Sequence, residues 1–258
     1  MNYVRAKKHL GQHFLKDINI AQKIVDNLTI EDTNQVLEVG PGMGVLTQFL
    51  IQKPNIQLKV IEIDSESVDY LSSNFPILKN NILEANFLKL DINKHFPEPF
   101  NLIGNFPYNI SSQIFFKVLE NKGKIPQIVG MIQKEVAERI SAPHGSKTYG
   151  ITSVLLQAYY DIEYLFTVNE NVFAPPPKVK SAVIRLKRNR VKQLDCDEVL
   201  FFKVVKAAFN QRRKMLRNSL KQAYGVVPDE FATLRPEQLN ISQFISLTRQ
   251  IELRLKNL

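Results

Sequence analysis

Three glycines at alternate positions follow a short apolar segment, and they constrain the fold more than any other feature of the sequence. The apolar segment, residues 36–39, is predicted to be a strand, and the glycines are Gly40, Gly42 and Gly44. Glycine allows both a tight turn and the close approach of a backbone to a ligand. The spacing is one residue shorter than the dinucleotide fingerprint, and no Lys-Ser/Thr pair follows it as in a phosphate-binding P-loop. The sequence therefore predicts a strand, a ligand-binding turn and a helix in that order.

The next predicted strand, residues 58–63, carries an acid near its end, Glu62. A carboxylate at this place can accept hydrogen bonds from both hydroxyls of a ribose. Together with the short glycine spacing, this favours the adenosyl group of S-adenosylmethionine over NAD. The alternative is a tight turn beside a solvent-exposed Glu62.

Strands and helices alternate along most of the chain, which predicts an α/β fold with a doubly wound, mostly parallel sheet of the Rossmann-like methyltransferase type. From Asp197 onward the patterning is helical only. We therefore expect a sheet domain at residues 1–190 and a small helical domain at residues 191–258. Strands are predicted at residues 36–39, 58–63, 82–83, 101–103, 128–132 and 181–186, and helices at residues 18–28, 45–52, 65–73, 111–120, 133–141, 149–159 and 207–221.

The sequence Asn-Phe-Pro-Tyr at residues 105–108 suits methylation of an exocyclic amine on a flat base. The lone pair of such an amine is delocalised into the ring, and two acceptors that bind its N–H groups make it available for attack. The Asn105 amide and the Phe106 carbonyl are the predicted acceptors, since Pro107 favours an extended Phe106 and has no N–H of its own. Tyr108 provides a ring on which a base can stack, worth ~1–3 kcal/mol. The alternative is an ordinary proline-containing loop after a strand.

The charge distribution points to a polyanionic partner. The formal net charge of the 258-residue chain is +9, and 14 of its 34 Lys and Arg lie between Lys178 and Lys221. Such a cluster suits nucleic acid, although a solvated basic surface is the alternative. The single Cys196 excludes an internal disulfide, and no Cys/His spacing indicates a metal. Without a signal peptide or a membrane span, we expect a cytoplasmic monomer.

Seven segments in the same order resemble the motifs of the ribosomal RNA adenine dimethyltransferases, the family that methylates small-subunit rRNA. They are residues 7–15, the turn at Gly40, Glu62, residues 105–108, 131–137, 173–179 and 209–218. The resemblance implies that residues 7–15 close over S-adenosylmethionine and that Phe173 stacks on the target base opposite Tyr108. The residues it implies are, for the cofactor, His13, Leu15, Gly40, Glu62, Asn86 and Asn105; for catalysis, Asn105, Phe106, Pro107, Tyr108 and Phe173; and for RNA, Lys7, Lys8, Arg212, Arg213, Lys214 and Arg217.

Two positions depart from the family pattern. His13 stands where the family usually has Asn, and we expect this residue to touch the cofactor largely through its backbone. Asn86 stands where the family usually has Asp, which accepts a hydrogen bond from the cofactor adenine. An amide oxygen still accepts that bond but lacks the charge that strengthens it, so we expect weaker cofactor binding than in relatives.

The resemblance implies an enzyme that dimethylates N6 of two adjacent adenines in the 3′-terminal hairpin loop of 16S rRNA, acting on the small ribosomal subunit during its biogenesis. One alternative is the related large-subunit rRNA adenine methylase that confers macrolide resistance. Others are a non-catalytic nucleic-acid-binding relative on the same fold and a DNA adenine methylase. The basic segment at residues 212–218 favours the small-subunit family over the first alternative. Intact Asn105 and Tyr108 and the lack of a transit peptide argue against the second, and the opening and C-terminal motifs argue against the third.

Overall fold

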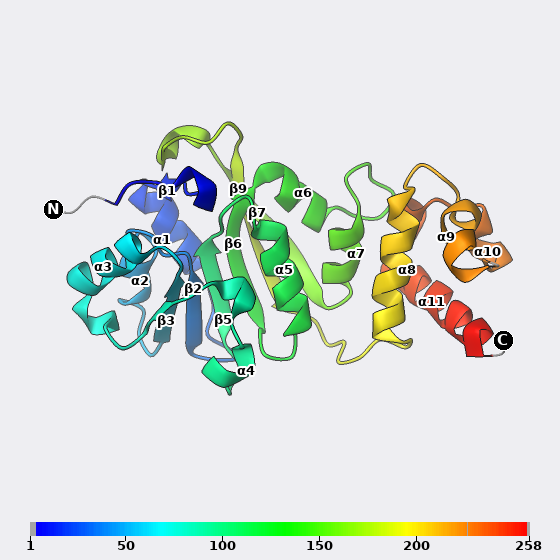
Figure 1. The fold of residues 1–258 in the computed structure, drawn as a ribbon, viewed down its shortest axis with the longest axis horizontal. Helices are drawn as coiled ribbons and strands as arrows, with labels where there is room; N and C mark the ends of the chain where they lie inside the picture. The colour runs from blue at the N-terminus through cyan, green and yellow to red at the C-terminus, as the bar shows by residue number, and fades with distance from the viewer. Residues whose placement is uncertain (1–3, 226, 257–258) are drawn as a thin grey trace. The chain divides into compact units, whose positions relative to one another are not determined.

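The main structural element is a seven-stranded sheet, seen in a computed structural model that describes residues 4–225 and 227–256 (Figure 1). In spatial order its strands are β4 (Ile82–Glu84), β3 (Gln57–Glu62), β2 (Gln35–Val39), β5 (Asn101–Asn105), β6 (Gln127–Gln133), β9 (Ser181–Arg188) and β7 (Tyr160–Val168). The strands from β4 to β6 run parallel, and β9 is antiparallel to β6. The predicted α/β fold with a mostly parallel sheet is confirmed.

The strand order reverses between β2 and β5. After β2 the chain adds β3 and β4 on one side and then returns to place β5 on the other. In open α/β sheets, ligands bind at the carboxyl ends of the strands at such a reversal. Gly40 follows β2 and Asn105 ends β5, so the glycine turn and the Asn-Phe-Pro-Tyr segment meet at this point.

The prediction missed one strand, β7. Its residues alternate in the way that indicates a strand, with Ile162, Tyr164, Phe166 and Val168 on one parity. A two-stranded antiparallel ribbon was also not predicted. It joins β1 (Phe14–Leu15) to β8 (Phe173–Ala174), and neither segment is long enough to show a period by itself.

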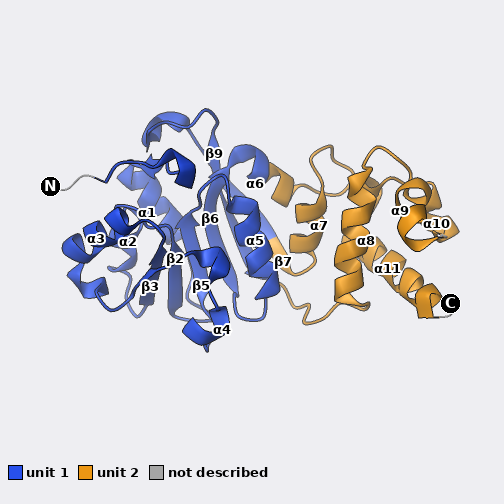
Figure 2. Cartoon of the chain, in the orientation of Figure 1, with its two compact units in different colours: residues 1–137, 162–188 blue, residues 138–161, 189–258 orange. Residues whose placement is uncertain are grey.

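The chain forms two compact units (Figure 2). The first comprises Met1–Ala137 and Ile162–Arg188, and the second comprises Glu138–Asp161 and Asn189–Leu258. The chain therefore crosses between the units three times. The domain division at residues 190–191 stays a prediction; the last crossing lies close to it.

Helices pack on the sheet of the first unit, and the second unit consists mainly of helices. The helices that lie in or begin in the first unit are α1 (Ile18–Asp26), α2 (Thr47–Leu50), α3 (Ser65–Asn74), α4 (Ile92–His95), α5 (Ser111–Glu120) and α6 (Lys134–Ser141). Those of the second are α7 (Ile151–Gln157), α8 (Glu198–Asn210), α9 (Leu216–Tyr224), α10 (Asp229–Ala232) and α11 (Ile241–Lys256). Short 3-10 turns lie between these helices and strands, at Lys8–Leu10, Pro76–Leu78, Phe87–Lys89, Glu170–Val172 and Pro236–Gln238.

Helix α1 illustrates how local sequence sets these elements. Asp17 precedes it, and the Asp17 carboxylate accepts hydrogen bonds from the backbone N–H groups of Asn19 and Ile20, which fixes the start of the helix. Helical spacing then places Ala21, Ile24 and Val25 on one face, where all three are buried in the core beside strands of the sheet.

The helix predicted at residues 207–221 is wrong as a single element. Helix α8 ends at Asn210 and α9 begins at Leu216. The buried face of α8 includes Val205 and Ala208, and a continuous helix would carry this face on to the polar Arg212. The intervening turn lets the exposed basic residues leave the buried face and starts a new apolar face at Leu216.

A pair of glycines makes room for the ring of Phe106. Gly104 of β5 and Gly130 of β6 stand opposite each other in the register. A Cβ atom on Gly104 would lie 2.5 Å from the Val39 carbonyl oxygen and 2.7 Å from the Phe106 ring, and one on Gly130 would lie 2.6 Å from the same ring. The ring is fully buried. It therefore anchors the segment whose backbone carbonyl was predicted to face the substrate.

Gly104→Ala tests this anchor. The added methyl group meets backbone as well as the ring, so we expect a loss of unfolding free energy of ~1–3 kcal/mol, the usual cost of overpacking a core. Urea unfolding measures it. The matched control is Gly123→Ala, whose added Cβ meets nothing within 4 Å. Equal stabilities of the two variants would contradict this packing.

Candidate active site

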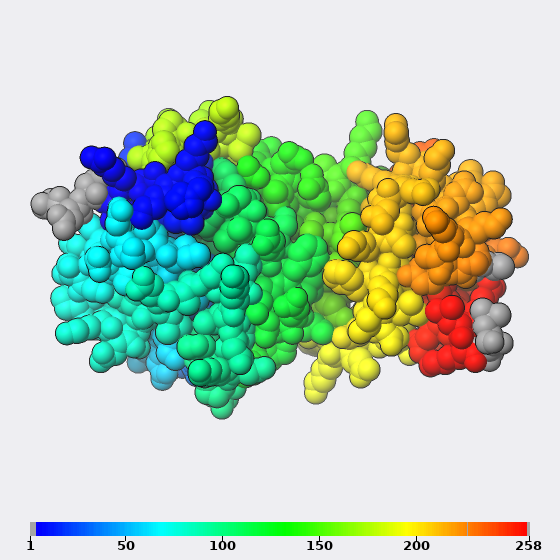
Figure 3. All heavy atoms as spheres, in the orientation of Figure 1, coloured from blue at the N-terminus to red at the C-terminus, as the bar shows by residue number. Residues whose placement is uncertain are grey.

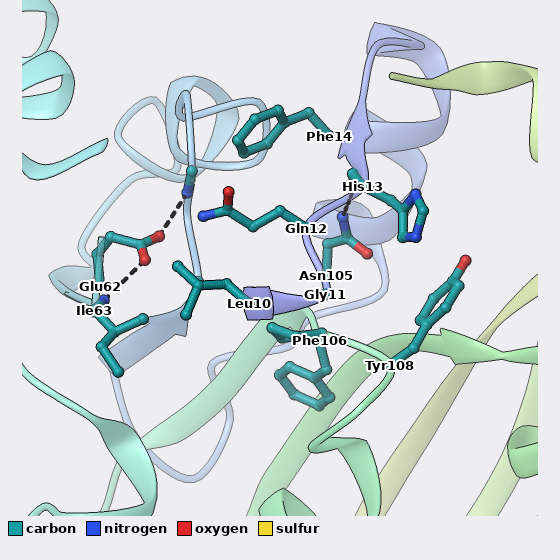
Figure 4. A pocket seen from close by; sticks show the side chains of 13 residues that line it. Leu10, Gly11, Gln12, His13, Phe14, Glu62, Ile63, Asn105, Phe106 and Tyr108 are labelled. Carbon is teal, nitrogen blue, oxygen red and sulfur yellow. Dashed lines mark hydrogen bonds between the residues drawn. The ribbon is translucent and has the colours of Figure 1, made fainter. Parts of the chain in front are cut away.

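A cavity lies where the glycine turn, the end of β3 and the Asn-Phe-Pro-Tyr segment meet (Figure 4). Its lining residues are Leu10, Gly11, Gln12, His13, Phe14, Gly40, Gly42, Glu62, Ile63, Asn105, Phe106, Pro107 and Tyr108. Four separate segments of the sequence, residues 10–14, 40–42, 62–63 and 105–108, thus form one pocket.

The Glu62 carboxylate holds the glycine turn against the end of β3. Its Oε2 accepts a hydrogen bond from Gly42 N–H at 3.1 Å, and its Oε1 accepts from Ile63 N–H at 2.8 Å and Asp64 N–H at 3.0 Å. Gly42 has a φ of +56°, a left-handed conformation that side chains disfavour, and the Phe14 ring packs directly on it. Glu62 therefore shapes the turn in addition to any contact with a ligand.

The Glu62 carboxylate can accept one more hydrogen bond, and a hydroxyl group is a suitable donor. Burial raises the pKa of Glu62, and the backbone hydrogen bonds from Asp64, Gly42 and Ile63 oppose that rise. A carboxylate has about four lone-pair sites, and the three backbone donors leave one on Oε2. The predicted role in binding a ribose hydroxyl stays a prediction that this geometry permits.

The N-terminal segment is fastened to the start of α3. Lys7 Nζ pairs with the Asp64 carboxylate and lies 3.2 Å from Glu66 Oε1. Gln12 Nε2 donates to Asp64 Oδ2 at 3.2 Å, and the Gln12 side-chain oxygen accepts from Lys7 N–H at 2.7 Å. Although desolvation alone would raise it, the hydrogen bonds from Lys7, Gln12 and Ser67 hold the pKa of Asp64 below its usual value. These contacts close one side of the cavity.

The other end of this segment also lies against a distant part of the chain. Lys16 N–H donates to the Val172 carbonyl at 2.8 Å, directly beside the β1–β8 ribbon. In Figure 3 the segment, in dark blue, lies on the surface beside the yellow-green stretch that contains β8.

The orientation of the Asn105 amide follows from one hydrogen bond. Asn105 Nδ2 donates to the backbone carbonyl oxygen of His13 at 3.0 Å. The amide nitrogen is therefore committed to the N-terminal segment, and Oδ1 remains as the acceptor beside the cavity. This is the atom that was predicted to bind the target amine.

The His13 ring contacts the Pro175 carbonyl and the ring of Tyr108. Its Nδ1 lies 2.8 Å from the Pro175 carbonyl oxygen, and because a carbonyl only accepts, Nδ1 carries the proton. The imidazole stacks on Tyr108 with ring centroids 5.3 Å apart and planes 30° from parallel. The His13 backbone thus contacts Asn105, while its ring extends the aromatic surface of Tyr108 (Figure 4). The backbone contact of His13 with the cofactor stays a prediction.

Tyr108 is held by its hydroxyl group. The hydroxyl shares a hydrogen bond with the hydroxyl of Ser181 at the start of β9. Burial raises the pKa of Tyr108, and the Ser181 hydrogen bond opposes the rise without cancelling it. The ring is therefore neutral at physiological pH and fixed in position, which suits a stacking surface.

Three predicted site residues lie outside the cavity lining. Leu15 is a core residue paired with Phe173 across the β1–β8 ribbon. Asn86 uses its Oδ1 to accept from Leu88 N–H at 2.9 Å and so caps a 3-10 turn. Phe173 is 1% exposed and belongs to the hydrophobic core. The prediction that Phe173 stacks on the target base is not supported by this placement, because the ribbon turns its ring inward.

The predicted RNA-binding residues also differ in their surroundings. Lys8, Arg213, Lys214 and Arg217 are exposed. The Lys7 ammonium is already paired with acids, and the hydrogen bond to Asp64 raises its pKa. Arg212 is half-buried and donates to the Ser146 carbonyl oxygen at 3.2 Å. Lys7 and Arg212 therefore fasten loops, and the other four cations are available for a partner.

Sequence reasoning missed Gln12, Asp64 and Ser181 as parts of the site. Asp64 follows the strand-end acid Glu62 closely enough to have been suspected, but Gln12 and Ser181 carry no local signal. Their roles come from contacts between segments that are far apart in the chain.

The residues present fit S-adenosylmethionine. This cofactor has a ribose diol, a cationic sulfur and an apolar adenine face. The cavity offers the free lone pair of Glu62, and Ile63 is 50% exposed beside it. A Cβ atom on Gly40 would find its nearest atoms at 3.9 Å, so the backbone there is open to a ligand. Across the described residues, we find no group of three or more His, Cys, Asp and Glu that could hold a metal ion.

Comparison with known proteins decides the family. The family model for ribosomal RNA adenine dimethylase matches residues 3–248. The chain belongs to this family. It is 59% identical to the ribosomal RNA small subunit methyltransferase A of Bacteroides thetaiotaomicron, covering 99% of this chain and 97% of that protein. It is 61% identical to the protein of the same name from Parabacteroides distasonis, covering 96% of this chain and 94% of that protein.

Solved structures agree on the fold. A dimethyladenosine transferase from Plasmodium falciparum superposes with a TM-score of 0.79 at 24% identity, covering 95% of this chain and 99% of that one. The 23S rRNA methyltransferase ErmE superposes with a TM-score of 0.68 at 25% identity, covering 92% and 99%. The predicted family and the methyltransferase fold class are confirmed, and the chain is an S-adenosylmethionine-dependent methyltransferase.

Glu62→Gln tests the dual role of this carboxylate. An amide has one oxygen and two N–H groups, so it cannot accept from all three backbone donors at once. Because hydrogen bonds to a charged group contribute ~1.5–3 kcal/mol each, we expect S-adenosylmethionine affinity to fall by at least about tenfold. Calorimetry measures it, with Glu120→Gln as control, an exposed acid at the end of α5. An unchanged affinity would mean that Glu62 is only a strand-end acid.

Proposed function

We propose that this enzyme transfers methyl groups from S-adenosylmethionine to N6 of two adjacent adenines in the 3′-terminal hairpin loop of 16S rRNA, twice on each base. The observation that carries the proposal is the Asn105 amide, which the His13 carbonyl orients so that its oxygen faces the cavity. The high identity to small-subunit methyltransferases from two bacteria supports the choice of substrate.

The residues of the site act by positioning the target amine. When bound, S-adenosylmethionine supplies an activated methyl group on a cationic sulfur. The Asn105 oxygen and the Phe106 carbonyl accept the two N–H groups of the amine and make its lone pair available to the methyl carbon. Phe106 has a buried ring and its N–H donates to the Met131 carbonyl at 3.0 Å, so its backbone is rigid. Catalysis comes mainly from this preorganisation.

The rings of Tyr108 and His13 form the surface on which the base stacks. Their rings already lie against each other, and an extruded base is held in such sites by stacking on aromatic side chains. The Tyr108 hydroxyl is bound to Ser181, and the His13 ring is bound to Pro175. Both rings are therefore ready to receive a base with little loss of side-chain freedom.

The exposed cations of the second unit supply affinity for RNA phosphates. Arg213, Lys214 and Arg217 lie at the turn between α8 and α9 and at the start of α9. No carboxylate pairs with them among the described residues. Contacts of this kind orient the RNA and do not read its sequence.

The competing functions have less support. The large-subunit methylase ErmE shares the fold but is 25% identical, against 59% for the small-subunit enzyme of Bacteroides thetaiotaomicron. A non-catalytic nucleic-acid-binding role has no use for an oriented Asn105 amide beside a cavity that Glu62 also lines.

We further propose that the enzyme acts as a monomer in the cytoplasm, on the small ribosomal subunit, and needs no metal. No helix among residues 4–225 and 227–256 has the length and apolar character required to cross a membrane. A direct methyl displacement needs no metal, because the alkylated amine is acidic enough to lose its proton to water.

Asn105→Ala tests the catalytic assignment. It removes one of the two acceptors that hold the amine, and the loss of a comparable preorganised polar group typically lowers kcat by ~10²–10³. Methyl incorporation into small subunits from cells lacking the gene measures the rate, and calorimetry checks that cofactor binding largely persists. Asn93→Ala, an exposed residue of α4, is the control. Retention of more than about a tenth of the rate would refute the assignment.

Arg213→Glu/Arg217→Glu tests the RNA surface. Each phosphate contact releases counterions and steepens the salt dependence of binding, so the double variant should bind small subunits more weakly and with a log affinity–log salt slope shallower by about 2. Cofactor affinity should not change. Lys79→Glu/Lys94→Glu makes the same change in charge at exposed residues of the first unit. Identical slopes for the two double variants would rule out the phosphate contact.

A further inference from the structure

Glu38 is a buried acid to which the proposed mechanism gives no task. It lies in β2, two residues before Gly40, and is 1% exposed. Its Oε2 accepts a hydrogen bond from the Thr47 hydroxyl at 2.6 Å. Glu38 lines a second, small cavity together with Gly40 and Asn105. Because Gly40 and Asn105 also line the main cavity, the two cavities adjoin.

Glu38 lacks a cationic partner within the described part of the chain. The groups that act on it are the Thr47 hydroxyl from α2 and the Glu62 carboxylate from the neighbouring strand β3. From β5, Asn105 contributes only a neutral amide to the same cavity. Burial, and to a lesser degree Glu62, raise the pKa of Glu38 to about 8, against the opposing effect of Thr47. Near neutral pH this side chain therefore holds a proton.

The cofactor brings a positive charge to this place. On the function proposed above, the methyl group must lie beside Asn105, where the target amine is held. The cationic sulfur is one bond from that methyl group, so it lies next to the cavity that Asn105 shares with Glu38. In a poorly hydrated site, a neighbouring positive charge strongly favours the ionised form of the Glu38 carboxyl group.

We propose that Glu38 senses the charge of the cofactor: it releases its proton when S-adenosylmethionine binds and takes one up when S-adenosylhomocysteine remains. The inference rests on the proposed function. In each turnover the N–C bond forms, the C–S bond breaks with its electron pair going to sulfur, and the amine loses one proton. As the sulfur becomes neutral, Glu38 takes one proton from the solvent. The site is therefore electrically balanced before and after the transfer.

This proton exchange makes the enzyme bind S-adenosylmethionine in preference to S-adenosylhomocysteine. Ionised Glu38 stabilises the cationic sulfur and gives nothing to the neutral thioether. The preference for S-adenosylmethionine over S-adenosylhomocysteine should therefore grow with pH, by about tenfold between pH 6.5 and pH 8.0, because proton release is linked to binding.

Calorimetry in two buffers of different ionisation enthalpy, phosphate and Tris, counts the protons directly. At pH 7.0 we expect the wild-type protein to release about 0.5–1 proton per S-adenosylmethionine through Glu38. Glu38→Gln keeps the shape and an acceptor for Thr47 but cannot titrate, and it should lose this release. The cofactor's own amino group titrates equally in both proteins and cancels in the difference. Glu98→Gln, an exposed acid, should behave as wild type.

Thr47→Val gives a second test that does not depend on the folding of Glu38→Gln. Without the hydroxyl, the pKa of Glu38 rises further in the free protein, so at pH 8.0 the variant should release more protons than the wild type. Equal proton counts for wild type and Glu38→Gln, or a Thr47→Val count that does not increase, would overturn the role of Glu38 while leaving the proposed function intact. Failure of the wild type to bind S-adenosylmethionine would overturn both.

Discussion

The active site depends on a single carboxylate that binds three backbone N–H groups. Glu62 connects Gly42 of the glycine turn to Ile63 and Asp64 at the end of β3. Such bonds offset the cost of burying its charge. They also hold a turn with a positive φ, which would otherwise have many alternative conformations. The position of the cavity follows from this tie, because the two strand ends define one of its walls.

Three carboxyl groups at this edge of the sheet differ in their roles because their hydrogen-bond and charge partners differ. Glu62 is buried but compensated by backbone donors, and Asp64 is paired with Lys7 and Gln12. Glu38 is equally buried, and the Thr47 hydroxyl is its only hydrogen-bond donor among the described residues. The pKa of Asp64 is lowered by its partners, so it is an anion at neutral pH, whereas burial raises the pKa of Glu62 against the effect of its three backbone donors. Glu38 is the least compensated of the three, and on the inference above it exchanges its proton as the charge of the cofactor changes.

Much of the site could be predicted because parallel strands deliver their carboxyl ends to one edge of a sheet. Gly40, Glu62 and Asn105 each follow or end a strand that the apolar pattern reveals, so their meeting was expected. The inward turn of Phe173, the pairing of Lys7 and the contact of His13 with Tyr108 could not be foreseen. Each depends on where the short β1–β8 ribbon or the N-terminal segment settles, and segments of two or three residues carry no period.

The N-terminal segment also affects the order in which the fold is completed. Its contacts reach Asp64 just before α3, Asn105 at the end of β5 and the ribbon strand β8, where Phe14 pairs with Ala174. During synthesis these residues are made well before their last partner, which lies about 160 residues further along the chain. Contacts of such sequence separation form slowly, because a long loop must close before they form. The wall of the cofactor cavity that this segment forms is therefore completed only after residues as distant as Ala174 have been made.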